Sequence, residues 1–398
     1  MSLLIHHILD SLDPAGGGVP MVAVQVAAAQ AHRGERVELH AIGHDQDTEL
    51  NGIHPREDLA TKLAVLPGMN QVKVCRHRSR ADLRSMLKAS QNAGPAWFHL
   101  HGVWDPALLT AAKLARQYQI PYCLTPHGML DPWSLTQSRL KKQLGMLLVH
   151  RRMLNRAVFL QALNNDEKRL MKPLSLRSAV EVVPNGVHLP DMSPEQAQMS
   201  LADFDSDLQP GRFFLFLARL HYKKGLDILL DAYANVLKSS RLPLDKSDIW
   251  PLVIAGPDEG MGDLIGSRMA SGNFPGRIVV PGPVYGSLKS ALLRTAGAVV
   301  LPSRQEGFSL TILEALVNER PAIISDQCHF DEVGTNDAGL VVPVDVKATA
   351  RAMSDLIHMT DEARQEMGIR GRAMVEGHFT WDRVAEILLE LYDSNRGR

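Results

Sequence analysis

Two glutamates mark the stretch of the chain with the clearest chemistry. Glu306 and Glu314 flank a segment that contains Gly307 and leads into an apolar run. If the intervening residues are largely helical, the rise of about 1.5 Å per residue places the two carboxyl groups about 12 Å apart. Glycosidase carboxylate pairs lie at most about 9.5 Å apart. The spacing therefore suits two acceptors that hold opposite ends of one long polar ligand.

Backbone N–H groups could bind an anion between these glutamates. The apolar residues 298–303 predict a buried strand. A short helix that stops near Pro321 is predicted after it, from the apolar residues Leu310, Leu313 and Leu316. A strand, a glycine loop and a helix start together expose N–H groups where a phosphate can bind. The alternative is one glutamate that stabilises the helix dipole and another on the surface.

Two cations on an earlier loop could neutralise a diphosphate. Arg219 and Lys224 lie between a strand predicted at 213–218 and a helix predicted to end near Leu237. Arginine forks onto phosphate oxygens, and lysine supplies a compact positive charge. The sequence contains neither an H-E-x-x-H motif nor a tight aspartate cluster for a metal. A solvated pair of charges is the alternative interpretation of these two residues.

The first half of the chain offers a histidine and a glycine loop. His127 follows the predicted strand 121–125, at the strand edge where open α/β sheets bind ligands. Gly16, Gly17 and Gly18 follow a predicted strand at 3–9, and glycines let a ligand approach the backbone. A structural histidine and a flexible turn are the alternatives. The loop is not G-x-G-x-x-G, so a nicotinamide-type fingerprint is absent.

Composition limits the class of protein. With 398 residues, two domains are expected, and 45% hydrophobic and 22% charged residues are ordinary for a soluble globular chain. No apolar run reaches the roughly 18–20 residues that span a bilayer, and no signal-peptide pattern is present. Widely spaced cysteines predict buried thiols in a reducing cytoplasm; they are Cys75, Cys123 and Cys328. The net charge of −1 argues against a nucleic-acid partner.

Charge is unevenly distributed between the two halves. Residues 1–190 carry 22 Lys and Arg against 15 Asp and Glu, a net +7, whereas the remainder carries 21 against 29, a net −8. Such asymmetry suggests that the first half faces something anionic. Residues 139–157 predict one basic amphipathic helix, which could lie on an anionic membrane or pack on the core. Its apolar face would comprise Leu140, Leu144, Leu147, Leu148 and Leu154.

Alternating strand and helix patterns must position these residues. Both halves repeat a strand, a loop and a helix, which predicts two doubly wound α/β domains with parallel sheets and a cleft between them. We expect an N-terminal domain at 1–190, a linker at 191–211 that is rich in Pro, Asp, Ser and Gln, and a second domain at 212–378. The last helix falls within 379–398.

Together these motifs resemble the retaining glycosyltransferases of family 4, also called glycosyl transferase group 1. The similarity is carried by A-R-L-H-Y-K-K-G at 218–225, E-G-F-S-L-T-I-L-E-A at 306–315, V-P-N-G-V at 183–187, P-H-G at 126–128 and the loop 16–18. It implies the GT-B fold, with two Rossmann-like domains, an interdomain cleft and a last helix that crosses back to the N-terminal domain. Ser309 and His188 depart from the residues common in the family.

The resemblance assigns roles to individual residues. Arg219 and Lys224 would bind the donor diphosphate, Glu314 the ribose hydroxyls and Glu306 the donor sugar. His127 would lie against the transferred sugar and help to stabilise the transition state, so His127 and Glu306 are the expected catalytic residues. Further donor contacts are expected from Gly17, Gly18, Gly256, Pro283, Val284, Gly307, Phe308, Ser309, Leu310 and Thr311.

The implied activity is transfer of a hexose from a UDP- or GDP-linked sugar with retained anomeric configuration. No cofactor and no metal would be needed, since the basic loop and helix dipole would stabilise the leaving diphosphate. The acceptor would be a hydroxyl of a lipid-linked, cell-envelope or exopolysaccharide glycan, and the location cytoplasmic, with a peripheral membrane position left open. The alternatives are a nucleotide-sugar-binding protein without transferase activity and a nucleotide-sugar 2-epimerase.

Overall fold

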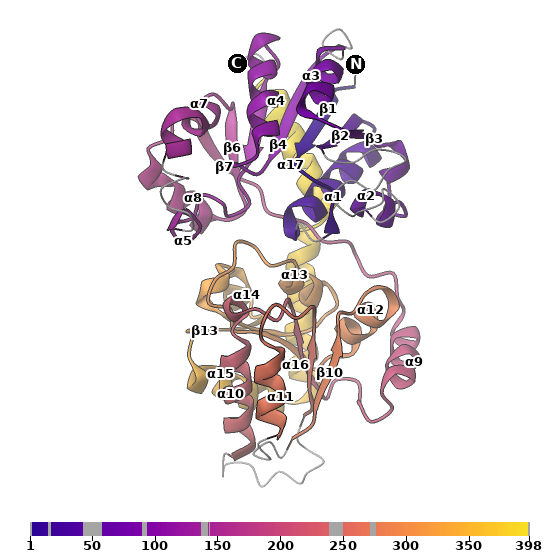
Figure 1. The fold of residues 1–398 in the computed structure, drawn as a ribbon. Coiled ribbons are helices and arrows are strands. Elements are labelled where there is room, and N and C mark those ends of the chain that lie inside the picture. The colour runs from indigo at the N-terminus through magenta and orange to yellow at the C-terminus, as the bar shows by residue number, and fades with distance from the viewer. Residues whose placement is uncertain are drawn as a thin grey trace. The chain divides into compact units, whose positions relative to one another are not determined.

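The chain folds into two compact units in the computed structural model (Figure 1). Unit 1 comprises Met1–Asn185 together with Trp381–Arg398, and unit 2 comprises Gly186–Thr380. The structure describes residues 2–14, 17–42, 58–89, 94–136, 142, 144–238, 250–270 and 276–396.

Unit 1 is built on a parallel sheet, seven-stranded over the described residues, in the order β3-β2-β1-β4-β5-β6-β7. Most of its strands are buried on both faces, as expected where helices cover a parallel sheet. β1 and β4 pair in register, so that His7 lies opposite His99. The strands are β1 (Leu4–Leu9), β2 (Arg36–Ile42), β3 (Lys73–His77), β4 (Ala96–His101), β5 (Tyr122–Thr125), β6 (Phe159–Ala162) and β7 (Ala179–Val182).

The helices of unit 1 include the last helix of the chain, α17, which packs against α1 (Figure 1). Val384, Leu388 and Tyr392 of α17 are buried, so this helix contributes to the core of unit 1. The helical segments are α1 (Gly18–His32), α2 (Leu59–Lys62), η3 (Met69–Gln71), α3 (Arg80–Ala89), α4 (Pro106–Gln117), α5 (Pro132–Thr136), η5 (Met146–His150), α7 (Arg151–Leu154), α8 (Asn165–Met171), η6 (Lys172–Leu174) and α17 (Trp381–Ser394).

Unit 2 has a second parallel sheet, six-stranded in the part of the chain that is described, in the order β10-β9-β8-β11-β12-β13. The order reverses between β8 and β11, the first and fourth strands of the unit, as in a Rossmann fold. The prediction of two Rossmann-like parallel-sheet domains is confirmed. The strands are β8 (Phe214–Leu217), β9 (Leu252–Ala255), β10 (Ile278–Gly282), β11 (Ala298–Leu301), β12 (Ala322–Ser325) and β13 (Gly339–Val342).

Helices surround the sheet of unit 2, and its main core includes Phe214, Leu229, Ile254, Val300 and Leu313. The helical segments are α9 (Pro194–Phe204), η7 (Tyr222–Lys224), α10 (Leu226–Lys238), α11 (Gly262–Ala270), α12 (Gly286–Thr295), α13 (Leu310–Val317), η9 (Asp326–Cys328), α14 (Glu332–Thr335), α15 (Val346–His358) and α16 (Asp361–His378).

The segment expected to be a linker, 191–211, is largely helix and belongs to unit 2. Ser193 and Gln196 form a reciprocal capping box at the start of α9, which satisfies N–H groups that the helix leaves unpaired. Ala197 and Leu201 are buried, and α9 packs against α12. The expectation of a linker was wrong because the buried apolar residues of this segment are too few to give a visible apolar period.

The prediction of one amphipathic helix over residues 139–157 is not supported by the part of this region that the structure describes. Residues 137–141 and 143 lie outside the described residues, and η5, a π-helical turn, precedes α7. Leu154 is buried, but Leu144 and Leu148 are 58% and 66% exposed, so the leucines do not share one buried face. Among the described residues, no helix combines the length and apolar character required to cross a membrane.

Candidate functional site

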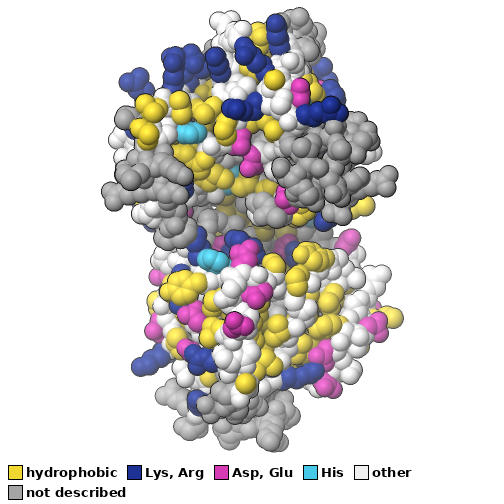
Figure 2. Space-filling view, viewed as in Figure 1, with side chains coloured by type: hydrophobic (Ala, Val, Ile, Leu, Met, Phe, Trp, Pro, Cys, Tyr) yellow, Lys and Arg dark blue, Asp and Glu magenta, His cyan; other side chains and the backbone are white. Residues whose placement is uncertain are grey.

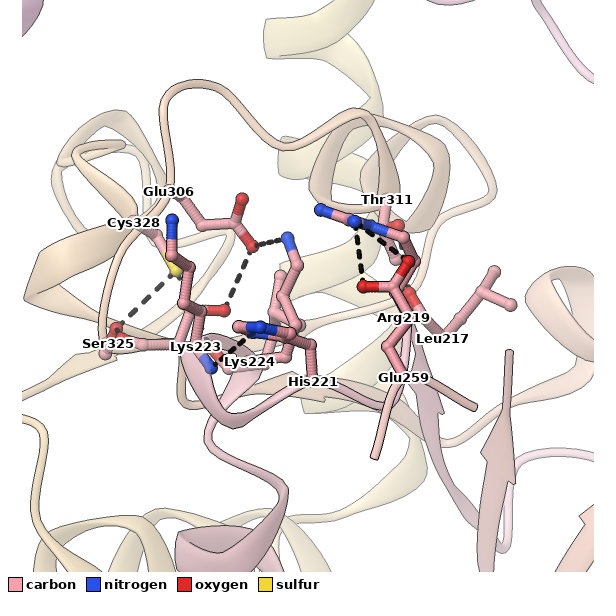
Figure 3. A network of polar contacts seen from close by, with 12 residues as sticks. Leu217, Arg219, His221, Lys223, Lys224, Glu259, Glu306, Thr311, Ser325 and Cys328 are labelled. Carbon is pink, nitrogen blue, oxygen red and sulfur yellow. Dashed lines mark hydrogen bonds and ion pairs between the residues drawn. The ribbon is translucent and has the colours of Figure 1, made fainter. Parts of the chain in front are cut away.

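A network of polar side chains lies where β8 and β11 end. These neighbouring strands are those at which the strand order reverses, and open α/β sheets bind ligands outside the carboxyl ends of the strands at this point. The loop after β8 carries Arg219 and Lys224, and the loop after β11 carries Glu306. Figure 3 shows these side chains close together.

The two loops are joined by an ion pair and by backbone contacts. Lys224 Nζ lies 2.5 Å from Glu306 Oε1, and the N–H of Arg304 donates to the carbonyl of Lys223 at 2.7 Å. Gly225 has a φ of +70°, and a Cβ there would lie 2.0 Å from the carbonyl oxygen of Pro302. Glycine is therefore required for the first loop to lie against the second.

Glu306 is held in one orientation. Its backbone N–H donates to the carbonyl of Gln327 at 3.1 Å, and the hydroxyl of Ser303 donates to Oε1 at 3.0 Å. The side chain is only 8% exposed, and that of Lys224 is 16% exposed. A carboxylate this buried is stabilised by its paired lysine and hydroxyl donor, so the carboxylate is positioned before any ligand binds.

Arg219 lies beside this pair in Figure 3 but has a different partner. Its guanidinium contacts Glu259 at 2.9 and 3.0 Å, and its side chain is 53% exposed. The loop after β8 also depends on Gly256, which has a φ of +149° and whose Cβ would meet the carbonyl oxygen of Ala218 at 1.9 Å. Gly256 thus allows the ends of β8 and β9 to approach closely.

The expected helix at 310–316 is α13, Leu310–Val317, which begins beside these loops. Its N-cap, Ser309, makes no side-chain cap hydrogen bond, so N–H groups of the first turn are not satisfied by that cap. The hydroxyl of Thr311 donates to the carbonyl of Leu217 at 3.0 Å, which fixes the helix start against β8. Phe308 packs on Phe330, and its side chain is partly buried against the core of unit 2.

Glu314 lies on α13, and its carboxylate contacts the helix α12. Its Oε1 lies 2.6 Å from Nζ of Lys289 on α12. Pro283 and Val284 follow β10; Pro283 is exposed, whereas the side chain of Val284 is buried in a core cluster. Gly307 is exposed beside Phe308. The structure thus gathers the expected residues of unit 2 along the carboxyl edge of β8, β9, β10 and β11.

Several polar residues of this edge were missed by sequence reasoning. Arg304 forms a bidentate pair with Asp227 at 2.7 Å and stacks on Tyr222, 3.9 Å from the ring centre. Desolvation raises the pKa of Asp227, but the hydrogen bonds and charge of Arg304 outweigh it and leave that pKa below its ordinary value. The position of Arg304, two residues before Glu306, could have identified it as a site residue. No pattern in the sequence pointed to Glu259 or Lys289.

His127 lies in unit 1, on the turn after β5. Its backbone has a φ of +52°, a conformation that is strained for a residue with a Cβ. The neighbouring N–H of Gly128 donates to the buried carboxylate of Glu167 at 2.7 Å, which also accepts from the N–H of Leu163 at 2.7 Å. Burial raises the pKa of Glu167, while these two hydrogen bonds lower it. Desolvation lowers the pKa of His127 to about 3, so its imidazole is neutral at pH 7.

Gly17 and Gly18 begin α1 in unit 1. Gly17 is the N-cap, with a φ of +75° and no side-chain cap hydrogen bond, and a Cβ at either glycine would meet nothing within 4 Å. Backbone N–H groups at this helix start are thus open to an approaching anion. Gly16 lies outside the described residues.

Two side-chain clusters of unit 1 have the composition of metal sites: His7 with His99 and His101, and Glu38 with His6 and His40. In the first, both ring nitrogens of every histidine make hydrogen bonds. In the second, Lys73 pairs with the carboxylate at 2.9 Å, and the two imidazoles contact each other at 3.0 Å. The ring nitrogens of the first cluster are therefore all satisfied by protein groups, whereas Nε2 of His6 in the second is buried without a hydrogen-bond partner among the described residues.

Both units match known families. Residues 17–186 match the family described as Glycosyl transferase 4-like domain, and residues 203–374 match Glycosyl transferases group 1. The chain is 32% identical over 204 residues to the D-rhamnosyltransferase WbpZ of Pseudomonas aeruginosa, covering 48% of this chain and 47% of that protein. It is 32% identical over 191 residues to the O-antigen chain mannosyltransferase C of Escherichia coli, covering 45% and 46%.

These matches span about half the length of each relative. Among solved structures, Anabaena Alr3699/HepE in complex with UDP has a similar fold, with a TM-score of 0.73 over 99% of this chain and 100% of that chain. Its sequence identity is only 17%, so this likeness concerns the fold.

Proposed function

The chain belongs to the group 1 glycosyl transferases of family 4, and on that premise we propose that it transfers a hexose from a UDP- or GDP-linked sugar to a hydroxyl group. The observation that carries the proposal is the convergence of Lys224, Glu306 and the start of α13 at the switch point of unit 2. This combination supplies a cation, a buried acceptor and the N–H groups of a helix start. A sugar linked to a nucleoside diphosphate presents groups complementary to all three.

Each residue has a defined part in this proposal. Lys224, Arg219 and the N–H groups from Gly307 to Thr311 hold the diphosphate, and Glu306 accepts from hydroxyls of the donor sugar. Glu314 accepts from the ribose, while Gly256 and the backbone at 283–284 border the nucleoside. Gly17 and Gly18 contact the donor from unit 1. Both glutamates are anchored by lysines at 2.5–2.6 Å, which supports their role as fixed acceptors.

We propose that the reaction needs no metal and retains the anomeric configuration. The bond between the anomeric carbon and the diphosphate oxygen breaks, and the acceptor oxygen bonds to the same face of that carbon. The acceptor proton passes to the departing diphosphate. Lys224, Arg219 and the helix start stabilise the negative charge that develops on this leaving group, and His127 contributes a neutral imidazole beside the sugar.

The proposed acceptor is a glycan carried on a lipid or destined for the cell envelope. The relatives named above include an O-antigen chain mannosyltransferase, and the net charge of +7 over residues 1–190 favours an anionic surface. Figure 2 shows many Lys and Arg side chains on the visible face of unit 1. Exposed apolar side chains lie near basic ones in a groove of about 610 Å³, which is lined by residues including Leu109, Lys113, Arg116, Leu148, Val149 and Arg152.

A panel of nucleotide sugars tests the transferase proposal. Purified protein is incubated with each UDP- and GDP-sugar and with candidate acceptors, and free nucleoside diphosphate is measured. We expect acceptor-dependent release with one donor class, without added metal and unaffected by EDTA. Donor binding without release, for every donor and acceptor tried, would favour a binding protein. Conversion of the donor sugar without an acceptor would favour an epimerase.

Liposome flotation tests the proposed membrane surface. The protein should float with vesicles that contain about 30% anionic lipid at low salt and dissociate as salt screens the contact. The double variant Arg116→Gln/Arg152→Gln should float less, whereas Arg351→Gln, which changes an exposed arginine of unit 2, should not. Absence of flotation at low salt would eliminate this surface.

A further inference from the structure

A continuous chain of buried hydrogen bonds runs through unit 1 and ends at His127. The side chains in it are fully buried up to His101, and His127 is partly buried. It starts at a backbone carbonyl and passes through strands, α1 and α17. In order, its members are Val183, Gln161, Thr125, His99, Tyr392, Gln30, His7, His101 and His127.

The first half of the chain has only one consistent arrangement of hydrogens. The carbonyl of Val183 can only accept, so the group 2.9 Å from it is the amide NH₂ of Gln161, and the amide oxygen faces Thr125 at 2.8 Å. The hydroxyl of Thr125 must then donate to that oxygen and accept from Nε2–H of His99, 2.7 Å away. His99 is left with a lone pair on Nδ1.

Tyr392 and Gln30 connect His99 to His7 and continue the same order of donors and acceptors. The hydroxyl of Tyr392, 2.7 Å from Nδ1 of His99, donates to that lone pair. It therefore accepts from the amide NH₂ of Gln30, which lies 3.4 Å away. This orientation points the amide oxygen of Gln30 at Nε2 of His7, at 2.8 Å. His7 must carry its proton on Nε2, because an amide oxygen can only accept.

The last steps transmit the arrangement to His127. With its proton on Nε2, His7 accepts at Nδ1 from Nε2–H of His101, 2.9 Å away. His101 in turn accepts at Nδ1 from Nε2–H of His127, 3.2 Å away. Burial lowers the pKa of His7 to about 4 and those of His99 and His101 well below the ordinary value, so each ring carries one proton at neutral pH.

We propose that Tyr392, Gln30, His7 and His101 are positioning residues that hold His127 as the neutral Nε2–H tautomer, with an unprotonated Nδ1. The opposite tautomer of His127 would reverse every donor in the chain and set the amide oxygen of Gln161 against the carbonyl of Val183. His127 therefore presents Nδ1 as a hydrogen-bond acceptor. The link to activity rests on the proposed function, whereas the tautomer itself does not.

The proton position is measured by ¹⁵N NMR of protein labelled at histidine, with the His127 signals identified by their loss in His127→Gln. At pH 7 we expect a protonated Nε2 and an unprotonated Nδ1. Tyr392→Phe keeps the ring that stacks on Trp97 at 4.7 Å but removes the hydroxyl, so Gln30 is free to rotate and His127 should become a mixture of tautomers. Thr125→Val should do the same from the other end, and Thr125→Ser should restore the single tautomer.

Kinetics provide the second measurement. In both disruptive variants kcat should fall about 10- to 100-fold, the range seen when a metal-bound histidine loses the partner that orients it, with KM for the donor within about twofold. Tyr122→Phe is the matched control, because it removes a buried hydroxyl of unit 1 that donates to Met153 at 2.6 Å, outside this chain. Tyr122→Phe should change neither the tautomer of His127 nor kcat.

Three results would overturn the proposal. They are an Nδ1–H tautomer in the unchanged protein, an unaltered His127 signal in both Tyr392→Phe and Thr125→Val, and one equivalent of zinc bound by His7, His99 and His101. The two readouts separate this proposal from the proposed function. Absence of transferase activity would refute the function and leave the tautomer result valid, whereas normal activity with a mixed tautomer would refute only the positioning role.

Discussion

At the scale of single residues, each cation of the candidate donor site already contacts a carboxylate. Lys224 pairs with Glu306 and Arg219 with Glu259. A diphosphate that binds here must take over at least part of these contacts. The two pairs differ in burial: the first is largely enclosed, and the second is solvent-exposed. Removal of the cation from the first pair should weaken donor binding, whereas removal of the carboxylate from the second should strengthen it.

Lys224→Met should weaken donor binding strongly. A hydrogen bond to a charged group contributes about 1.5–3 kcal/mol, or about 10- to 150-fold in affinity. The change also leaves Glu306 without its cation. We expect KM for the donor to rise within that range, measured by nucleotide release. Lys347→Met, at an exposed lysine of α15, is the control; an unchanged KM in Lys224→Met would remove this lysine from the site.

Glu259→Gln should strengthen donor binding slightly. The amide cannot neutralise Arg219, so the guanidinium becomes more available to the diphosphate. Exposed ion pairs contribute about 0.2–1 kcal/mol, so KM for the donor should fall by at most about fivefold, with kcat unchanged. Asp355→Gln is the control, since Asp355 pairs with Arg351 on the surface of α15. A higher KM in Glu259→Gln would mean that Glu259 itself serves the donor.

At the scale of elements, sequence patterns were enough for the parallel sheets and for the helix after Glu306. The loop contacts were not predictable, because they depend on which strands become neighbours. The sequence places Arg304 and Asp227 far apart, and only the adjacency of β8 and β11 brings them into contact. The hydrogen bonds between the histidines of β1 and β4 likewise depend on the register of the sheet, which the sequence does not show.

Gly225→Ala should test how the loops after β8 and β11 are joined. The added Cβ would meet a carbonyl oxygen at 2.0 Å in a left-handed backbone, which costs about 1–2 kcal/mol for the conformation alone. We expect a loss of at least about 2 kcal/mol in urea unfolding and weaker donor binding. Gly266→Ala, where a Cβ in α11 meets nothing within 4 Å, should be neutral or stabilising. Equal stability of the two variants would contradict the predicted clash.

The buried histidines of the strands predict sensitivity to acid. Burial lowers the pKa of His7 and of His40 to about 4, against about 6.5 in the unfolded chain. Between these values the unfolded state binds more protons, so stability falls as pH decreases from 6.5 to 4, by about 1.4 kcal/mol per pH unit for each histidine. Urea unfolding at pH 7 and pH 5 measures this. Equal stability at both pH values would refute the prediction.

At the scale of the whole molecule, unit 1 is completed by a segment that follows unit 2 in the sequence. Deletion of residues 381–398 should remove the buried face of α17 and the stacking of Tyr392 on Trp97. We expect unit 1 to lose protection in hydrogen exchange while unit 2 retains it. Deletion of residues 395–398 alone, beyond α17, should have no such effect. Protection of unit 1 in the longer deletion would show that α17 is dispensable for its fold.

The return of the chain to unit 1 also sets an order for folding during synthesis. Domains usually fold as they leave the ribosome, the N-terminal one first. Here all residues of unit 2 emerge before α17, so the later unit can finish first while the earlier one waits for its last helix. Until Tyr392 arrives, His99 lacks one of its two hydrogen-bond partners. The nascent chain therefore acquires the complete histidine network only after all of unit 2 has been synthesised.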